Sequence, residues 1–339
     1  MSKIKIGQIG ICHEHASGKI DSVRKLPDIF EVVGVVDDRS TTAAKYAGSN
    51  LKPYEGLRWL SEDELLNYPG LQAVLVEVPN TDLVPVAMRC MERGLAMHMD
   101  KPGGEDLALF GKLVAGCKAK QLPFQMGYMF RGNPAMQWCI KAARNGWLGD
   151  IYEIQTSMSH NYGGDDYQEY LGNYRGGIMF NLCCHFIDFV VDILGRPTGV
   201  TSFLKNAPGT RPGIVNNALS ILDYPEATVT LRACSKEVNG LNCRRLKICG
   251  TKGTADLCPV ERFDGKPLTM ELHLKEANAD YPAGDQIVDF GIKTDRYIDQ
   301  LTELAKIIKG ELPNPDIYDH DCLVQEILLA ASGYTQWEK

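Results

Sequence analysis

Short apolar strands alternate with helical segments over the first 130 residues of the chain. The predicted strands cover residues 3–11, 30–36, 73–78, 95–99 and 122–129, and a helix over Glu105–Lys120 is among the segments between them. Consecutive strands joined by helices run parallel, because each right-handed crossover returns the chain to the same edge of the sheet. This part of the chain is therefore predicted to be α/β, a Rossmann-type doubly wound parallel sheet that binds a nucleotide.

After Gly149 the pattern changes to closely spaced strands, predicted at residues 151–159, 200–204, 216–224, 228–235 and 244–248, with others near 255 and 269. One long helix, Gly177–Leu194, falls between the first two, and two more helices follow at residues 294–309 and 320–331. These elements predict an α+β domain with a large, open, mostly antiparallel sheet. Since 339 residues exceed what one hydrophobic core usually covers, we predict two domains, residues 1–125 and 126–339.

The charge balance limits the kinds of partner. A net charge of −7 and an isoelectric point near 5.6 leave no basic stripe that could neutralise nucleic-acid phosphates or an anionic membrane. We therefore expect a small-molecule ligand, with no nucleic acid and no membrane. The eleven cysteines lack repeated CxxC spacing, which favours reduced thiols, and the N-terminus has no signal-peptide pattern. Both observations predict a cytoplasmic protein.

A lysine stands at the end of the fourth predicted strand. In the sequence LAMHMDKPGG, residues 95–104, the apolar strand stops at Asp100 and is followed by Lys101 and Pro102. Open parallel sheets bind their ligands at the carboxyl ends of the strands. Lys101 is therefore either a catalytic cation beside a cofactor or a surface lysine in a loop.

The first two predicted strands carry part of a dinucleotide-binding pattern. The first predicted strand runs into Gly10, and Asp37 follows the second strand at the distance where an acid binds the adenosine ribose. Cys12 and His15 occupy the second and third glycine positions of the usual fingerprint, so this signal is weak. Cys12, His13 and His15 also resemble metal ligands, but no other cluster completes a set, and we expect no bound metal.

The helix predicted over Gly177–Leu194 is apolar on nearly every face but carries a polar stripe. The stripe consists of Asn181, His185, Asp188 and Asp192, which recur every three or four residues. One interpretation is an internal hydrogen-bond network in which Asp188 holds the His185 ring. The other is the wall of a cleft, with a histidine for proton transfer and an amide that orients the substrate.

The segment before that helix, residues 160–177, combines tyrosines with carboxylates, one arginine and several glycines. Its tyrosines are Tyr162, Tyr167, Tyr170 and Tyr174. Aromatic rings pack on sugar faces while acids accept hydrogen bonds from hydroxyl groups, which would suit a polyol ligand. The alternative is an exposed loop at an interface.

Several motifs together resemble the Gfo/Idh/MocA oxidoreductases, a family that includes glucose–fructose oxidoreductase and inositol dehydrogenase. The likeness spans essentially the whole chain. It rests on Val78-Pro79-Asn80, on Asp100-Lys101-Pro102, on GYMFRGNP at residues 127–134, on the segment from Gly176 through His185 to Asp188, and on GTKGT at residues 250–254. The resemblance implies a domain that binds NAD or NADP, and an open sheet through which a homodimer or homotetramer forms.

The resemblance also implies roles for particular residues. Lys101 would be the catalytic lysine, and His185 the histidine that works beside it at the substrate hydroxyl. The family's usual aspartate is Asn181 here, and an amide cannot accept a proton at neutral pH. The cofactor would be bound by Gly10, Cys12, His13, His15, Asp37, Asp38, Arg39, Pro79, Asn80, Asp100 and Lys101. The substrate would be bound by Lys101, Tyr128, Arg131, His160, Tyr162, Tyr174, Asn181 and His185.

These roles imply an NAD(P)-dependent oxidoreductase that transfers a hydride between nicotinamide and a hydroxyl carbon of a sugar, glycoside or cyclitol. Asp37 favours NAD over NADP, because its carboxylate would bind ribose hydroxyls and repel a 2′-phosphate, whereas Arg39 could turn toward that phosphate. Two alternatives stay open. One is a redox-assisted glycoside-cleaving enzyme that retains NAD. The other is a sugar or nucleotide sensor without catalysis, against which the presence of Lys101 and His185 weighs.

Overall fold

The computed structural model describes residues 2–40, 50–161 and 164–338, and the chain divides into two compact units. The first unit comprises residues 1–129 and 297–325, and the second comprises residues 130–296 and 326–339. Residues 297–325, predicted as part of the second domain, thus belong to the first unit. The reason is packing, because Tyr297 and Leu301 join the buried core of the first unit.

Six parallel strands form the sheet of the first unit, in the order β3-β2-β1-β4-β5-β6. Their bounds are Ile4–Ile9 (β1), Phe30–Val36 (β2), Trp59–Leu60 (β3), Ala73–Val76 (β4), Ala96–Met99 (β5) and Phe124–Met126 (β6). The direction of strand succession reverses between β1 and β4, which is where doubly wound sheets bind their ligands. The predicted parallel sheet is confirmed, and β3 is a short strand that the sequence did not reveal.

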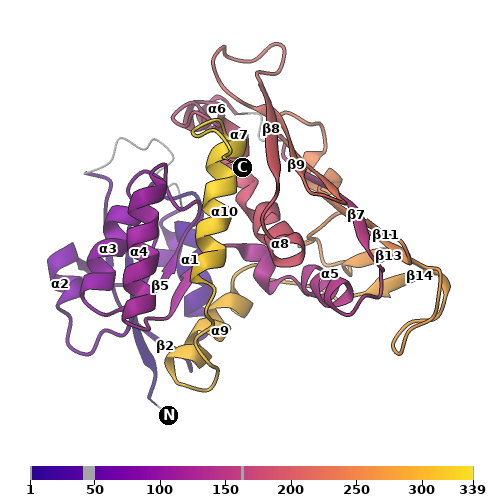
Figure 1. Ribbon diagram of the computed structural model, residues 1–339. Coiled ribbons are helices and arrows are strands. Elements are labelled where there is room, and N and C mark those ends of the chain that lie inside the picture. The colour runs from indigo at the N-terminus through magenta and orange to yellow at the C-terminus, as the bar shows by residue number, and fades with distance from the viewer. Residues whose placement is uncertain (1, 41–49, 162–163, 339) are drawn as a thin grey trace. The chain divides into compact units, whose positions relative to one another are not determined.

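Helices cover both faces of this sheet (Figure 1). They are α1 (Ala16–Arg24), α2 (Glu62–Leu66), α3 (Leu83–Glu92), α4 (Leu107–Ala119) and α9 (Ile298–Ile308), with a 3₁₀ turn at Lys52–Tyr54, and α10 (Tyr318–Ala331) follows α9. On one face, Val23 of α1 and Leu301 of α9 pack on Ile6 and Leu75 of the strands. Each such apolar side chain contributes roughly 1.5–3 kcal/mol when it is buried.

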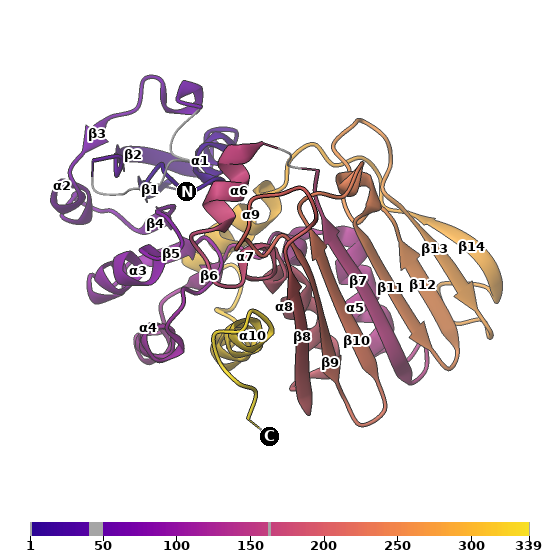
Figure 2. The same ribbon diagram turned by 90° about the horizontal axis from the view of Figure 1, so that it is seen from above.

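The second unit contains an eight-stranded sheet in the order β14-β13-β12-β11-β7-β10-β9-β8, visible in Figure 2. The strands are Ile151–Ser159 (β7), Gly199–Lys205 (β8), Asn217–Asp223 (β9), Thr228–Cys234 (β10), Arg245–Gly250 (β11), Gly253–Leu257 (β12), Thr269–Leu274 (β13) and Gly284–Asp289 (β14). β7 and β10 are parallel, whereas the other neighbouring pairs are antiparallel. The predicted mostly antiparallel sheet is confirmed.

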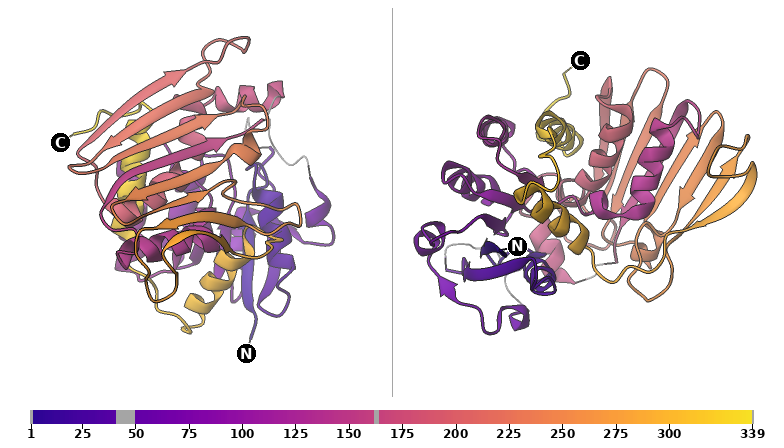
Figure 3. Two further views of the ribbon diagram at one scale, coloured as in Figure 1. Left: turned by 90° about the vertical axis from the view of Figure 1, so that its right-hand side faces the viewer. Right: turned by 90° about the horizontal axis from the view of Figure 1, so that it is seen from below.

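Helices α5 (Pro134–Arg144), α7 (Gly177–Leu182) and α8 (Cys184–Leu194) lie on one face of this sheet (Figure 2). Alternate strand residues such as Ile154 and Leu231 are buried beneath them. The opposite face carries Phe203, which is paired with Leu219 of the next strand, and within the described part of this unit no helix lies over it (Figure 3). The second unit is therefore a sheet with one covered face and one open face.

The single helix predicted over Gly177–Leu194 is two helices, α7 and α8, that meet at Cys183. The ψ angle of Cys183 is −12°, whereas an α-helix has ψ near about −42°. This departure interrupts the helical hydrogen bonds between Asn181 and His185, two residues of the predicted polar stripe. A short helix at Asp165–Leu171 (α6) precedes α7 and was not predicted. Among the described helices, none is long and apolar enough to cross a membrane.

Candidate active site

The turn after β1 begins at a glycine in the conformation of a tight turn. Gly10 has a φ of +92°, and a Cβ atom added to it would lie 2.7 Å from the backbone of Glu77. Only glycine fits there. One oxygen of Asp38 accepts hydrogen bonds from the backbone N–H groups of Ile11 and Cys12, at 2.8 and 3.2 Å. Asp38, predicted to bind the cofactor, thus holds the shape of the turn.

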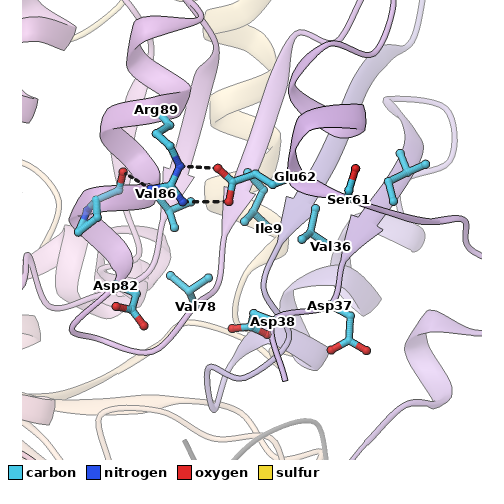
Figure 4. A pocket seen from close by; sticks show the side chains of 12 residues that line it. Ile9, Val36, Asp37, Asp38, Ser61, Glu62, Val78, Asp82, Val86 and Arg89 are labelled. Atoms are coloured by element: carbon cyan, nitrogen blue, oxygen red, sulfur yellow. Dashed lines mark hydrogen bonds and ion pairs between the residues drawn. The ribbon is translucent and has the colours of Figure 1, made fainter. Parts of the chain in front are cut away.

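A pocket of about 430 Å³ lies at the carboxyl ends of β1, β2 and β4 (Figure 4). Its charged lining residues are Asp37, Asp38, Glu62, Asp82 and Arg89. Arg89 forms a two-pronged ion pair with Glu62, in which Nη2 and Oε2 are 2.9 Å apart. The pocket therefore offers more acceptors than cations, which suits the hydroxyl groups of an adenosine ribose. Its residues fit the adenosine part of NAD.

Asp37 and Arg39, both predicted at the cofactor, are paired with each other. Arg39 donates from Nε to Asp37 Oδ1 at 3.0 Å and from Nη2 to Oδ2 at 2.5 Å. Hydrogen bonding from Arg39 lowers the pKa of Asp37 below its ordinary value. A carboxylate at this position stays ionised at neutral pH and is available to ribose hydroxyls.

His13 and Asn80 come from different strand ends and meet in the interior. His13 Nε2 lies 3.0 Å from Asn80 Oδ1, and the His13 backbone N–H donates to the carbonyl of Glu77 at 3.1 Å. Burial lowers the pKa of His13 to about 4, so its ring is neutral at pH 7. The neighbouring Cys12 is buried. Burial is the main cause that raises the pKa of its thiol, and the hydrogen bond with Asp38 raises it further, so the thiol stays protonated.

Lys101 lies directly after β5 and is fully buried. Its ammonium Nζ is 3.5 Å from Oε1 of Glu14, a residue of the turn after β1. The Lys101 backbone N–H donates to Asp100 Oδ1 at 2.7 Å. On its other oxygen, Asp100 is 3.1 Å from Nδ1 of His15. The structure therefore brings together three predicted cofactor or catalytic residues, His15, Asp100 and Lys101, with Glu14, which was not predicted.

The sequence did not single out the polar groups that lie beneath this turn. Lys19 of α1 is fully buried, and its Nζ lies 2.5 Å from His98 Nε2, 3.4 Å from Glu77 and 3.2 Å from Asp100. The ring of Tyr297 lies 5.0 Å from the same ammonium. His98 Nδ1 in turn lies 2.7 Å from Gln125 Oε1.

The two carboxyl groups of this network share one ammonium. Burial raises the pKa of Glu77 well above its ordinary value. Burial also opposes ionisation of Asp100, but His13, Lys19 and His15 outweigh it and hold its pKa well below the ordinary value. Two close carboxyl groups rarely ionise together. We therefore assign the negative charge to Asp100 and the proton to Glu77.

One signal could have revealed the network. Strands buried on both faces are usually continuous apolar runs, yet four strands or strand ends of the first sheet carry a buried polar residue. These residues are Gln8, Glu77, His98 and Gln125. Buried polar groups that recur on neighbouring strands of one sheet indicate a shared partner, which is Lys19 for Glu77 and His98.

His13, His15 and Asp100 present ligand atoms within 4.8 Å of one another, a spacing that a metal ion could use. The ammonium of Lys19, 3.2 Å from Asp100, already supplies a positive charge to the same carboxylate. We therefore assign no metal to this cluster, and the expectation of no bound metal stays a prediction.

In the second unit, Asn181 is held between two tyrosines of α6. Its Nδ2 donates to Tyr167 Oη at 3.1 Å, and Tyr170 Oη donates to its Oδ1 at 3.4 Å. Asn181, Tyr167 and Tyr170 are all buried. The polar stripe and the tyrosine-rich segment, predicted separately, therefore meet at this amide.

His185 is buried, and its ring packs on Phe130 with 5.4 Å between ring centroids. Asp188, which was predicted to hold the His185 ring in one interpretation, instead binds Arg131. Arg131 donates from Nη2 to Asp188 Oδ1 at 2.6 Å and from Nε to both oxygens at 3.1 Å. A guanidinium matches a carboxylate with two parallel hydrogen bonds, so it is the better partner.

The other predicted substrate residues belong to both units. His160 is buried and accepts from Arg244 Nη2 at Nδ1, 2.6 Å away. Arg244 also pairs with Glu261, which Arg296 binds through two further hydrogen bonds. Tyr174 is buried against Tyr170 and Phe180, and Tyr128 is buried in the first unit. Tyr162 lies outside the described residues.

Two segments of the chain match family models. Residues 4–128 match the model described as an oxidoreductase family with an NAD-binding Rossmann fold, and residues 136–256 match the Gfo/Idh/MocA C-terminal domain. Uncharacterized oxidoreductase C26H5.09c of Schizosaccharomyces pombe is 25% identical over 248 residues, which cover 68% of this chain and 64% of that protein. The match spans less than two thirds of that relative, and YhhX of Escherichia coli is 27% identical over 45% of this chain and 44% of its own length.

Solved structures share the fold. Aldose–aldose oxidoreductase from Caulobacter crescentus, complexed with glycerol, has a TM-score of 0.76 at 18% identity and covers 97% of this chain and 96% of its own. Levoglucosan dehydrogenase, in complex with NADH and L-sorbose, has a TM-score of 0.78 at 14% identity, with 98% and 97% of the two chains covered. Together with the two family models, the glycine turn and the acidic pocket lead to one conclusion: the chain belongs to the Gfo/Idh/MocA family of oxidoreductases, with an NAD-binding Rossmann domain.

Proposed function

We propose that the protein is an NAD-dependent dehydrogenase or reductase that acts on a hydroxyl-bearing carbon of a sugar, glycoside or cyclitol. The observation that carries this proposal is Lys101, a fully buried lysine at the carboxyl end of β5 in the NAD-binding domain. The names of two fold neighbours, one complexed with glycerol and one with L-sorbose, support a polyol substrate.

The proposed chemistry divides between two side chains. Bound NAD supplies the hydride acceptor. The ammonium of Lys101 would stabilise negative charge on the substrate oxygen as the hydroxyl proton leaves. His185 would accept that proton, because the amide of Asn181 has no basic atom at neutral pH. Asn181, held by Tyr167 and Tyr170, would orient a substrate hydroxyl.

The charges of the pocket also support a preference for NAD over NADP. The pocket carries four carboxylate residues, and its one arginine is paired with Glu62. A 2′-phosphate would add two negative charges to this environment, so NAD should bind more tightly than NADP. Residues His13, His15, Pro79, Asn80 and Asp100 are proposed to shape the cofactor site, and Tyr128, Arg131, His160 and Tyr174 the substrate site.

The open face of the second sheet is proposed as the surface through which two or four copies associate. Support comes from its apolar pairing of Phe203 with Leu219 and from the exposed fraction of Phe203, 49%. All eleven cysteines, which lie in the described part of the chain, are free thiols. A reducing compartment such as the cytoplasm is therefore proposed for the protein.

One experiment tests the function. The protein would be incubated with NAD and a panel of cyclitols, free sugars and aryl glycosides, while the absorbance of reduced cofactor and the release of aglycone are followed together. Accumulation of NADH with one class of polyol supports the proposal. Aglycone release without net NADH would indicate a cleaving enzyme instead, and binding of ligand without either signal would indicate a sensor.

A further inference from the structure

Glu14 places a carboxylate beside the proposed catalytic lysine. It lies between the two histidines of the turn after β1, and its side chain is only 12% exposed. Its Oε1 is 3.5 Å from Lys101 Nζ and 3.5 Å from His15 Nε2. Burial opposes the ionisation of Glu14, but Lys101, His15 and His13 together lower its pKa below the ordinary value, against repulsion from Asp100. Glu14 is therefore ionised at neutral pH.

Nucleotide binding does not explain a carboxylate at this position. The turn between the first strand and helix of a Rossmann domain faces the pyrophosphate of the dinucleotide. An added negative charge in that turn repels the two phosphate charges and weakens binding. Pairing with Lys101 offers the compensation, because a fully buried ammonium without an opposite charge tends to lose its proton.

We propose that Glu14 is a positioning residue for Lys101, which keeps the buried side chain charged and holds its ammonium in place. This inference rests on the proposed function, in which Lys101 is the catalytic cation. Glu14 takes no proton in the reaction. The hydroxyl proton goes to His185, and Lys101 remains an ammonium that donates a hydrogen bond to the substrate oxygen. The titratable groups that act on the charge of Glu14 include Lys101, His15, His13 and Asp100.

The substitution Glu14→Gln keeps the size of the side chain and removes its charge. The kcat should fall about tenfold to a hundredfold, because a displaced or discharged lysine no longer meets the substrate oxygen. In the pH profile of kcat, the alkaline limb, where Lys101 loses its proton, should move to lower pH. The dissociation constant for NAD, measured by titration, should stay the same or decrease, since a charge that repels the pyrophosphate is gone. Glu14→Asp, which retains the charge, should recover part of the alkaline limb.

A matched control is Glu92→Gln, which removes an exposed carboxylate at the end of α3 and should change none of these quantities. Lys101→Met completes the series. If Lys101→Met keeps near-normal kcat, the proposed role of Lys101 fails, and the role of Glu14 fails with it. If Lys101→Met is inactive but Glu14→Gln keeps the wild-type kcat and alkaline limb, only the Glu14 inference is overturned. Weaker NAD binding by Glu14→Gln would also overturn it, because the residue would then be a structural part of the turn.

Discussion

The ammonium of Lys19 in α1 lies 2.5 Å from Nε2 of His98 in β5, and both side chains are fully buried. A lysine can donate to that nitrogen only while the imidazole is neutral. Burial, reinforced by Lys19, lowers the pKa of His98 to about 3, and burial lowers that of His13 to about 4. Between about pH 6.5 and 5, the native protein therefore keeps two histidines neutral that the unfolded chain would protonate.

This relationship predicts that acid destabilises the fold before any carboxylate of the network titrates. Below the ordinary histidine pKa of about 6.5, the unfolded chain binds two more protons at His13 and His98, whereas native Glu77, with its raised pKa, binds one more than the unfolded chain. Over these three groups, the unfolded chain therefore binds one proton more than the native protein. The free energy of unfolding should thus decrease by ~1.4 kcal/mol per pH unit between about pH 6.5 and 5.

Urea unfolding at several pH values measures this slope. Glu77→Gln removes the opposing proton, so its slope should be roughly twice that of the wild type, ~2.7 kcal/mol per pH unit. His273→Asn, at an exposed histidine of β13, is the control and should leave the slope unchanged. Equal slopes for the wild type and Glu77→Gln would show that Glu77 is ionised in the native state.

The Asp37–Arg39 pair predicts how cofactor preference can be changed. The wild type should bind NAD more tightly than NADP. In Asp37→Ser, a like charge is removed and Arg39 loses its two-pronged partner, so its guanidinium can meet a 2′-phosphate. The ratio of NADP to NAD affinity should rise by about tenfold or more.

Titration of both cofactors into the two proteins measures the ratio. The double variant Asp37→Ser/Arg39→Ala is the control, and it should lose most of the gain in NADP affinity. Tighter binding of NADP than of NAD by the wild type would contradict the prediction.

Lys101→Met is predicted to lower kcat by ~10²–10³, the usual effect of removing one preorganised donor at a developing oxyanion. Methionine fills a similar volume, so the fold should persist. Lys112→Met, at an exposed lysine of α4, should retain full activity. Steady-state kinetics on a confirmed substrate, with circular dichroism of each variant, would make the comparison. A variant that kept its kcat would make Lys101 a structural residue.

Local sequence patterns predicted the elements but not the partners of their polar side chains. The strand before Lys101 is recognisable because it is a short apolar run that stops at a charged tripeptide. Two partners of Lys19 lie 58 and 79 residues away, one directly after β4 and one in β5, and no helical or strand period relates such positions. The same holds for Asp188. Helical spacing suggested His185 as its partner, whereas Arg131, 57 residues away, binds it.

The amide of Asn181 predicts a pH dependence of catalysis. If His185 is the only base, alcohol oxidation by the wild type should increase with pH through a single ionisation. Asn181→Asp places a carboxylate four residues before the histidine, and by attraction it should move that ionisation to higher pH. The fold should tolerate the change, because Tyr170 already donates to Oδ1 and the hydroxyl of Tyr167, which accepts from Nδ2 in the wild type, can rotate to donate.

The measurement is the pH dependence of kcat/KM for three proteins on one substrate: the wild type, Asn181→Asp and His185→Ala. His185→Ala should lose the ionisation altogether, because the group that titrates has been removed. Asn173→Asp adds the same charge at an exposed position before α7 and should leave the profile as in the wild type. If neither Asn181→Asp nor His185→Ala alters the profile, neither side chain takes part in proton transfer. The hydrogen bonds of Asn181 to Tyr167 and Tyr170 would then serve only to hold α6 against α7.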